Sequence, residues 1–161
     1  MSTGWNGALR CIESTRMKIR FLLVWGRAAD KKFKSPDAFG LYQEYLHRIN
    51  RFLPTTTEGI SNLPSRKPRV LVWVCDRTAK PASSEEVAAK LERAFSQGVS
   101  ELCIAIGPPD GFRKNEDLES SDWIWSFGTM TLPHELAAVV AAEQFYRALT
   151  ILKKLPYHQG H

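Results

Sequence analysis

Short apolar runs alternate along the chain with segments in which apolar residues recur every three or four positions. Three of the runs, residues 18–25, 70–75 and 101–106, are rich in Val, Leu and Ile and have the length of strands. Continuous apolar runs are typical of parallel strands that are buried on both faces. The pattern therefore predicts an α/β fold, with helices packed around a mainly parallel sheet.

The first helix is predicted between the first two of these strands. Ser35 followed by Pro36 is a typical N-cap and first helical residue. Apolar residues then follow at helical spacing as far as Leu53, and Pro54 ends the helix. Residues 55–68 are rich in Thr, Ser, Gly and Pro, so we expect a linker there.

Two more helices are predicted in the second half. Ser83 and Glu86 have the spacing of a capping box, and Gly98 supplies a helix stop. Residues 122–128 are expected to form a further strand, and residues 135–153 a helix that is apolar on almost every side. Such a helix has to be buried on two sides, and a second copy of the chain is the simplest way to cover it.

The length and composition indicate one domain. The chain has 161 residues, of which 43% are hydrophobic, and it contains no apolar run long enough to span a membrane. We expect residues 17–161 to form this domain and residues 1–16 to be a disordered extension, unless Met17 is the true start. The first segment lacks the apolar core of a secretory signal, so a cytoplasmic protein is expected.

The three cysteines, Cys11, Cys75 and Cys103, have no C-x-x-C spacing, and two of them lie in predicted strands. This arrangement indicates reduced thiols in the core rather than disulfides or a metal site. The charge is unevenly distributed: residues 1–80 contain 15 Lys and Arg against 6 Asp and Glu, whereas residues 81–161 contain 7 against 11. A basic half suits a surface that faces RNA, although such charges also simply solvate a surface.

A turn with two adjacent prolines follows the third apolar strand. Residues 107–111 read Gly-Pro-Pro-Asp-Gly, so the G-x-G-x-x-G pattern of a dinucleotide site is absent. The prolines stiffen the turn, which would allow it to hold a ligand against backbone groups. A purely structural turn is an equally good interpretation of the residues alone.

Four blocks of the second half carry a resemblance to a known family. They are Ile-Gly-x-Pro-Asp-Gly at 106–111, Trp-Ser-Phe-x-x-Met-Thr-Leu-Pro-His at 125–134, Ala-Glu-Gln-x-Tyr-Arg-Ala at 142–148 and Pro-Tyr-His at 156–158. In order and spacing they resemble the RlmH family. Its members are SPOUT-class methyltransferases that use S-adenosylmethionine to methylate N3 of a pseudouridine in large-subunit ribosomal RNA.

The resemblance implies a SPOUT-type α/β knot, in which loops thread as a trefoil, and a cytoplasmic homodimer that acts on ribosomal RNA without a metal or a membrane. It places the cofactor pocket at Cys75, Gly107, Pro108, Phe127, Gly128, Thr129, Met130, Thr131 and Leu132. Near the target base we expect His134, Arg147, Tyr157 and His158. Closure of the site by the last two residues, across the dimer, is one way to explain the Pro-Tyr-His block.

Two of these residues have structural interpretations as well. His134 follows directly on Pro133 and would equally cap or pack at the helix entrance. Glu143 and Arg147 are four residues apart on one helix, so an ion pair is as good an interpretation of Arg147 as RNA contact.

The chain also departs from the family pattern. Relatives have glycine where this chain has Pro108, and arginines where it has Ala138 and Gln159. They also carry a strand and a helix between the first helix and the central strand, and residues 55–68 are too few for both, so we expect a sheet that is smaller by one strand. These departures leave a second hypothesis open, a knot-fold RNA- or ribosome-binding module with weakened catalysis.

Overall fold

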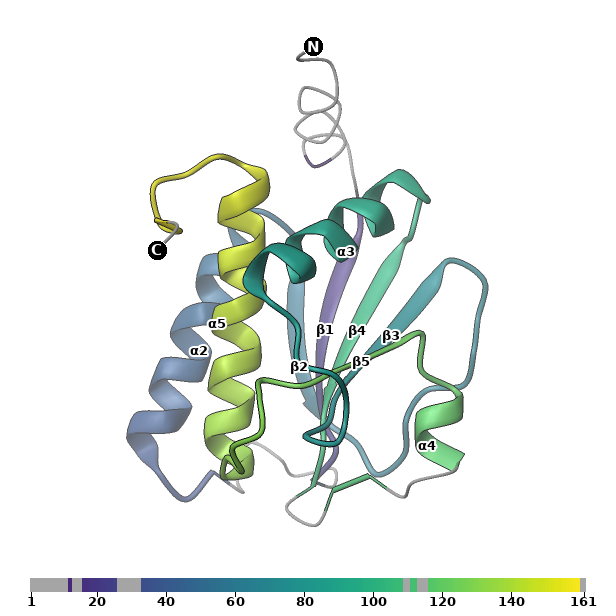
Figure 1. The fold of residues 1–161 in the computed structure, drawn as a ribbon, viewed down its shortest axis with the longest axis vertical. Coiled ribbons are helices and arrows are strands. Elements are labelled where there is room, and N and C mark those ends of the chain that lie inside the picture. Colours follow the sequence, from purple (N-terminus) through teal and green to yellow (C-terminus); the bar gives the residue numbers. More distant parts are fainter. Residues whose placement is uncertain (1–11, 13–15, 26–32, 109–110, 113–115, 160–161) are drawn as a thin grey trace.

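A computed structural model of the chain describes residues 12, 16–25, 33–108, 111–112 and 116–159. Five parallel strands form one sheet in the order β2-β1-β4-β3-β5 (Figure 1). The strands are β1 (Lys18–Leu23), β2 (Thr55–Gly59), β3 (Val70–Cys75), β4 (Glu101–Ile106) and β5 (Trp123–Trp125). The predicted α/β fold with a parallel sheet is therefore confirmed, and all carboxyl ends of the strands meet at one edge.

Three long helices pack on one face of this sheet. They are α2 (Pro36–Asn50), α3 (Ser84–Ser96) and α5 (His134–Leu152), and the four-residue helix α4 (Glu116–Glu119) lies apart from them (Figure 1). The main core joins strand residues such as Phe21 and Trp73 to helix residues such as Phe145, all at most 2% exposed. Phe145 meets Phe21 edge to face, with ring centres 5.9 Å apart. Burial of each such side chain contributes roughly 1.5–3 kcal/mol.

Both predicted helix caps are present. The Ser35 hydroxyl accepts a hydrogen bond from the Ala38 N–H at 3.2 Å, with Pro36 as the first residue of α2. In α3, the Ser83 hydroxyl accepts from the Glu86 N–H at 3.1 Å, while the Glu86 carboxylate accepts from the Ser83 N–H at 2.7 Å. These bonds satisfy main-chain donors that a helix start otherwise leaves unpaired.

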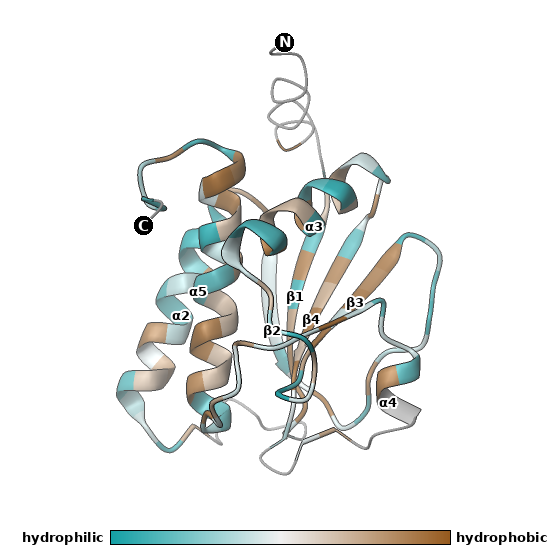
Figure 2. Ribbon diagram, in the orientation of Figure 1, coloured by the Kyte–Doolittle hydropathy of each residue, from teal (hydrophilic) through white to brown (hydrophobic). Residues whose placement is uncertain are grey.

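The other face of the sheet is covered by connecting segments rather than by long helices. Strand residues on this face include Leu22, Val74 and Ala105, each fully buried. They are covered by Ile60, Leu63, Phe112 and Leu118, which belong to the connections after β2 and β4. Figure 2 shows how the hydrophobic residues concentrate in β1, β4 and β3, between the two covers.

The prediction that residues 55–68 are only a linker is wrong at its start. Thr55–Gly59 forms the edge strand β2, aligned with β1 from Ile19 opposite Thr55 to Leu23 opposite Gly59. Thr57 holds the strand to α2, because its hydroxyl lies 2.7 Å from the Tyr42 hydroxyl. The sheet thus keeps the strand that we expected to be missing, and residues 60–69 form no helix.

The last strand and the last helix differ in detail from expectation. β5 is shorter than residues 122–128, because Ser126 makes only an isolated bridge to Pro81 and Gly128 has a φ of 121°. α5 lies between α2 and α3 and against the sheet, so this chain itself buries most of its apolar surface (Figure 1). Burial of α5 alone is therefore no argument for a second copy.

Most of residues 1–16, including Cys11, lies outside the described residues. The disordered extension and the reduced state of Cys11 therefore stay predictions. Cys75 and Cys103 are buried free thiols. Within the described part of the chain, no three His, Cys, Asp or Glu residues are placed to hold a metal ion, and no helix is long and apolar enough to cross a membrane.

Two glycines allow a test of the backbone assignments. Gly98 has a φ of 69° and an added Cβ would meet nothing within 4 Å, so Gly98→Ala is expected to destabilise the fold by about 1–2 kcal/mol through backbone strain alone. Gly40 lies inside α2 with equally open surroundings, so Gly40→Ala is expected to stabilise by about 0.5–1 kcal/mol. Urea unfolding of both variants measures this, and effects of the same sign would contradict it.

Candidate active site

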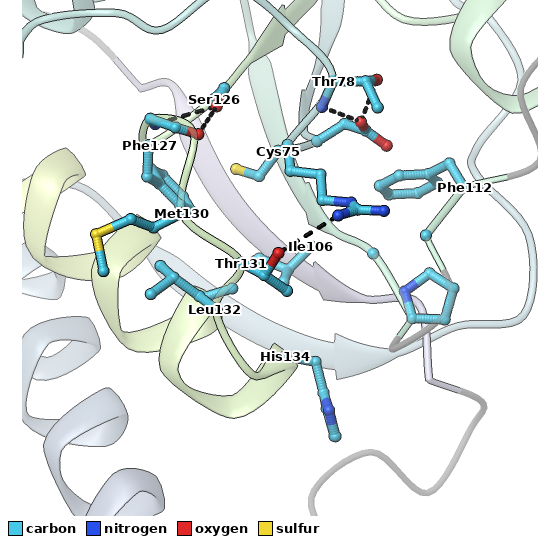
Figure 3. Close-up of a pocket in the computed structure, with 17 residues that line it drawn as sticks. Cys75, Thr78, Ile106, Phe112, Ser126, Phe127, Met130, Thr131, Leu132 and His134 are labelled. Carbon is cyan, nitrogen blue, oxygen red and sulfur yellow. Dashed lines mark hydrogen bonds between the residues drawn. The ribbon is translucent and has the colours of Figure 1, made fainter.

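A pocket of about 460 Å³ opens at the carboxyl edge of the sheet. Its walls come from the ends of β3, β4 and β5, from the loop after β5 and from the first turn of α5. In Figure 3, Phe127, Met130 and Leu132 lie on one side of it and Phe112 on the other. The lining residues are Cys75, Asp76, Arg77, Thr78, Ile106, Gly107, Pro108, Gly111, Phe112, Ser126, Phe127, Gly128, Met130, Thr131, Leu132, His134 and Ala137.

The turn after β4 is fixed from two sides. The Trp25 indole Nε1–H donates to the Gly107 carbonyl at 2.9 Å, and the Gly111 N–H donates to the Pro108 carbonyl at 2.9 Å. The Phe112 ring lies so close to Gly107 that an added Cβ would come within 2.7 Å of it. Any larger residue at position 107 would therefore force the Phe112 ring, which also covers the sheet face opposite the long helices, to shift.

The end of β3 contributes a buried thiol and a charged loop. Burial raises the pKa of the Cys75 thiol well above its ordinary value, so Cys75 is an apolar wall rather than a nucleophile. The Asp76 carboxylate accepts hydrogen bonds from the Thr78 N–H at 2.8 Å and from its hydroxyl at 2.5 Å. Arg77 reaches across the pocket, where its Nη1 donates to the Thr131 hydroxyl at 3.3 Å.

The loop that joins β5 to α5 lines the pocket with Met130, Thr131 and Leu132. Ser126 fixes the start of the loop, because its hydroxyl donates to the Gly128 carbonyl at 2.8 Å and accepts from the Gly128 N–H at 3.1 Å. Beyond this point, no described residue forms a hydrogen bond with the main-chain groups of residues 129–132. Met130 is 78% exposed at the rim. The loop thus offers donors, acceptors and an apolar side chain to a ligand.

His134 lies where the pocket meets α5. Its ring points away from the Phe127 and Thr131 side chains (Figure 3) and packs edge to face on Trp25, with ring centres 4.5 Å apart. Both interpretations of His134 are thus compatible with its position, since it lines the pocket and packs at the helix entrance. The next residue, Glu135, accepts hydrogen bonds from the N–H groups of Lys34 and Ser35 and so ties this entrance to the start of α2.

The other three predicted catalytic residues form a separate cluster near the far end of α5. Arg147 donates to the Glu143 carboxylate through Nη2 at 2.7 Å and Nε at 3.0 Å, and the Tyr157 hydroxyl donates to the same oxygen at 3.0 Å. Arg147 also lies over the Tyr157 ring, 4.9 Å from its centre. The expected Glu143–Arg147 ion pair is therefore present.

The hydrogen bonds of this cluster determine where its protons lie. Arg147 Nη1 lies 3.2 Å from His158 Nδ1 and can only donate, so Nδ1 accepts and the imidazole proton is on Nε2. Nε2 in turn lies 2.9 Å from the Glu85 carboxylate of α3 and donates to it. Burial, together with hydrogen bonds to Tyr45 and Glu143, raises the pKa of Tyr157, which therefore stays a neutral donor.

The structure thus divides the predicted site residues into two groups. Of the nine predicted cofactor residues, all but Thr129 line the pocket, and so does His134. Arg147, Tyr157 and His158 do not line it within one chain. Arg147 lies 13 positions after His134, which corresponds to a rise of about 20 Å along α5.

Residue-by-residue reasoning missed several lining residues. Arg77 and Thr78 follow the end of a parallel strand, where open α/β sheets place ligands, and this position was the available signal. Phe112 comes directly after the proline turn, and Ser126 lies inside the second of the four blocks that carry the resemblance. Neither had a local pattern that distinguishes a pocket wall from a core residue.

Comparison with known proteins agrees with this architecture. A family model described as "Predicted SPOUT methyltransferase" matches residues 17–158, so the chain belongs to the SPOUT methyltransferase class. A protein of Koribacter versatilis named ribosomal RNA large subunit methyltransferase H is 42% identical over 155 residues, which cover 90% of this chain and all of that protein. The protein of the same name from Bartonella bacilliformis is 35% identical over 83% of this chain and 86% of its own length. The chain therefore belongs to the RlmH family of SPOUT methyltransferases, and the resemblance found in the sequence is confirmed.

The contact between Gly107 and Phe112 yields a prediction about the turn. Gly107→Ala forces its Cβ against the Phe112 ring and is expected to destabilise the protein by about 1–3 kcal/mol. In a Phe112→Leu background the ring is gone, so the same substitution is expected to cost much less. A double-mutant cycle by urea unfolding measures the difference, and an equal cost in both backgrounds would show that the ring does not set the requirement for glycine.

Proposed function

We propose that this protein transfers a methyl group from S-adenosylmethionine to large-subunit ribosomal RNA, at N3 of a pseudouridine. The observation that supports this most directly is the pocket at the carboxyl edge of the sheet, whose walls coincide with the blocks that resemble the RlmH family. The names of its relatives support ribosomal RNA of the large subunit as the substrate. A cytoplasmic location follows from that substrate.

The lining of the pocket suits this cofactor. Phe127, Met130 and Leu132 provide apolar surface for the flat adenine base, and the main-chain groups of residues 130–132 are available to its polar edge. Arg77 supplies a cation for the carboxylate of the cofactor or for a phosphate of the RNA. Pro108 has no N–H, so the turn after β4 contributes shape rather than a donor. When bound, the cofactor supplies an electrophilic methyl group.

Methyl transfer requires the chain to align the acceptor nitrogen and to accept its proton. Within one subunit only His134 of the predicted catalytic residues reaches the pocket. Arg147, Tyr157 and His158 are held together at the other end of α5. We propose that a homodimer brings this cluster of one subunit to the pocket of the other.

Exposed apolar side chains support a second subunit near the start of α5. Leu136 of α5 and Leu41 of α2 are each 47% exposed, and Met130 at the pocket rim is more exposed still. We further propose that residues 17–161 form a single domain and that its loops thread as the trefoil knot of SPOUT proteins. A knot around the pocket would hold the turn after β4 and the loop after β5 in fixed relation.

The activity can be tested with the full chain in two measurements. Isothermal titration is expected to show binding of S-adenosylmethionine, and tritiated cofactor is expected to label ribosomes from cells that lack the gene. Mass spectrometry of the large-subunit RNA then identifies the modified nucleotide. Failure to bind the cofactor even at millimolar concentration would refute the proposal.

The same measurements separate the second hypothesis. A chain that binds the cofactor and ribosomes but labels no ribosomal RNA is the RNA-binding module with weakened catalysis, and Pro108, Ala138 and Gln159 are then the positions to restore. Ala138 is fully buried, so an arginine there would require α5 to repack. Pro108 is half-buried and Gln159 is exposed, so the fold accommodates glycine at position 108 and arginine at position 159 more readily.

Mixed dimers test whether each site uses both subunits. His134→Ala and His158→Ala are each expected to lower activity about 100-fold. When the two variants are refolded together, one site of each heterodimer is intact, so activity is expected to return to about a quarter of the unaltered level. A radiometric assay of the mixture measures this.

The matched control combines Arg147→Ala with His158→Ala. Both substitutions lie in the same cluster, so neither site of that heterodimer is intact and no recovery is expected. Recovery in the control, or none in the first mixture, would show that the cluster and the pocket do not act together across subunits.

A further inference from the structure

A second pocket, of about 330 Å³, lies between α3 and the edge strand β5. One wall is a single face of α3, made by Glu86, Ala89, Lys90 and Arg93 at helical spacing. The opposite wall contains Trp123 and Ile124 of β5, and the segment before α3 closes one end with Lys80, Pro81 and Ala82. Ala89 is the smallest residue of the helix wall and leaves the space open.

Three cations surround this space. Lys80 and Arg93 are exposed, whereas Lys90 is half-buried with its ammonium 5.2 Å from the centre of the Trp123 ring. Among the described residues, no carboxylate lies within ion-pair distance of Lys80, Lys90 or Arg93. By contrast, Arg20, Arg48 and Arg147 each have a glutamate partner.

The one acidic side chain that lines the second pocket already accepts a main-chain hydrogen bond. Glu86 accepts the Ser83 N–H at 2.7 Å as part of the capping box of α3. The lining therefore carries three positive charges and the single negative charge of Glu86, which gives the pocket a net positive charge. Trp123 gives it an apolar floor, and attraction between opposite charges is stronger beside such a surface than in open water.

We propose that this second pocket binds phosphate groups of the RNA strand on one side of the target nucleotide. The inference rests on the proposed function, because RNA is the polyanion which that function brings to the protein. Lys80 and Arg93 would contact the phosphates, and Lys90, held over Trp123, would extend the positive surface. Contacts of this kind position a strand without reading its sequence.

The position of the second pocket relative to the first favours this ligand over an isolated anion. Residues 76–82 form one short segment whose start, with Arg77, lines the first pocket and whose end, with Lys80, lines the second. β5 is shared in the same way, since Trp123 faces the second pocket while Phe127, just beyond the strand, faces the first. An RNA strand whose target base approaches the cofactor in the first pocket would thus meet Arg77 and then Lys80.

The test compares two double variants that remove the same charges. K80A/R93A removes one lysine and one arginine from the second pocket, whereas R66A/K67A removes one of each from the exposed connection before β3, near the other end of the strands. Binding of a fluorescein-labelled oligouridine of about twelve nucleotides is followed by fluorescence anisotropy at several salt concentrations.

In K80A/R93A, the slope of log K against log salt is expected to become about 1.4 smaller in magnitude, and affinity at low salt to fall on the order of 10-fold. The control is expected to change neither.

A third variant separates the pocket from a general loss of charge. Ala89→Glu keeps every cation but places a carboxylate among them. Its attraction to Arg93 at i+4 offsets its repulsion from Glu85 at i−4, and far-UV circular dichroism checks that α3 stays folded. It is expected to weaken oligouridine binding about as much as K80A/R93A. Equal effects in K80A/R93A and R66A/K67A, or no RNA binding by the unaltered chain, would overturn the proposal.

Cofactor titration and methyl incorporation by the same variants distinguish this inference from the proposed function. If methyl transfer is present but the salt slopes of the two double variants agree, only the second pocket has been misassigned. If the slopes differ as expected but no methyl group is transferred, the RNA contact stands and the catalytic proposal fails.

Discussion

The hydrogen bonding of β4 to a parallel strand on each side sets the geometry on which the rest of the molecule depends. Its register aligns Ile106 with Leu23 of β1 and with Cys75 of β3, and Cys75 is aligned with Trp125 of β5. Four strands therefore end at one level, and the pocket lies where three of them, β3, β4 and β5, end. Since five of the six residues of β4 are buried, a shift of this register would expose the core as well as dismantle the pocket.

The parts of the fold that the sequence predicted well are those with a local physical cause. β3, and β4 after Glu101, are apolar because both of their faces are covered, and α2 and α3 are capped by serines whose hydroxyls accept a helix N–H. β2 was missed for the opposite reason. Its Thr-Thr-Thr-Glu-Gly sequence is polar, since an edge strand needs little burial, and β-branched threonines fit a strand as well as a loop.

The candidate site shows the same division. The pocket residues lie in contiguous segments at strand ends, so their positions could be inferred from motifs and from the topology. The separation of His134 from Arg147, Tyr157 and His158 could not, because it depends on the length and direction of α5 and on the side chains that hold residues 157–158 against it. The second pocket could not be predicted either, because it forms only where the charged face of α3 lies beside β5.

The hydrogen bond from Trp25 to the Gly107 carbonyl also governs what the neighbouring proline does. In a trans peptide the C=O bond and the N–H bond of the following residue point in opposite directions, and no described peptide bond is cis. With the oxygen held toward Trp25, the ring of Pro108 occupies the place where another residue would present its N–H. This wall of the pocket therefore offers a ligand the shape of the proline ring rather than a hydrogen-bond donor.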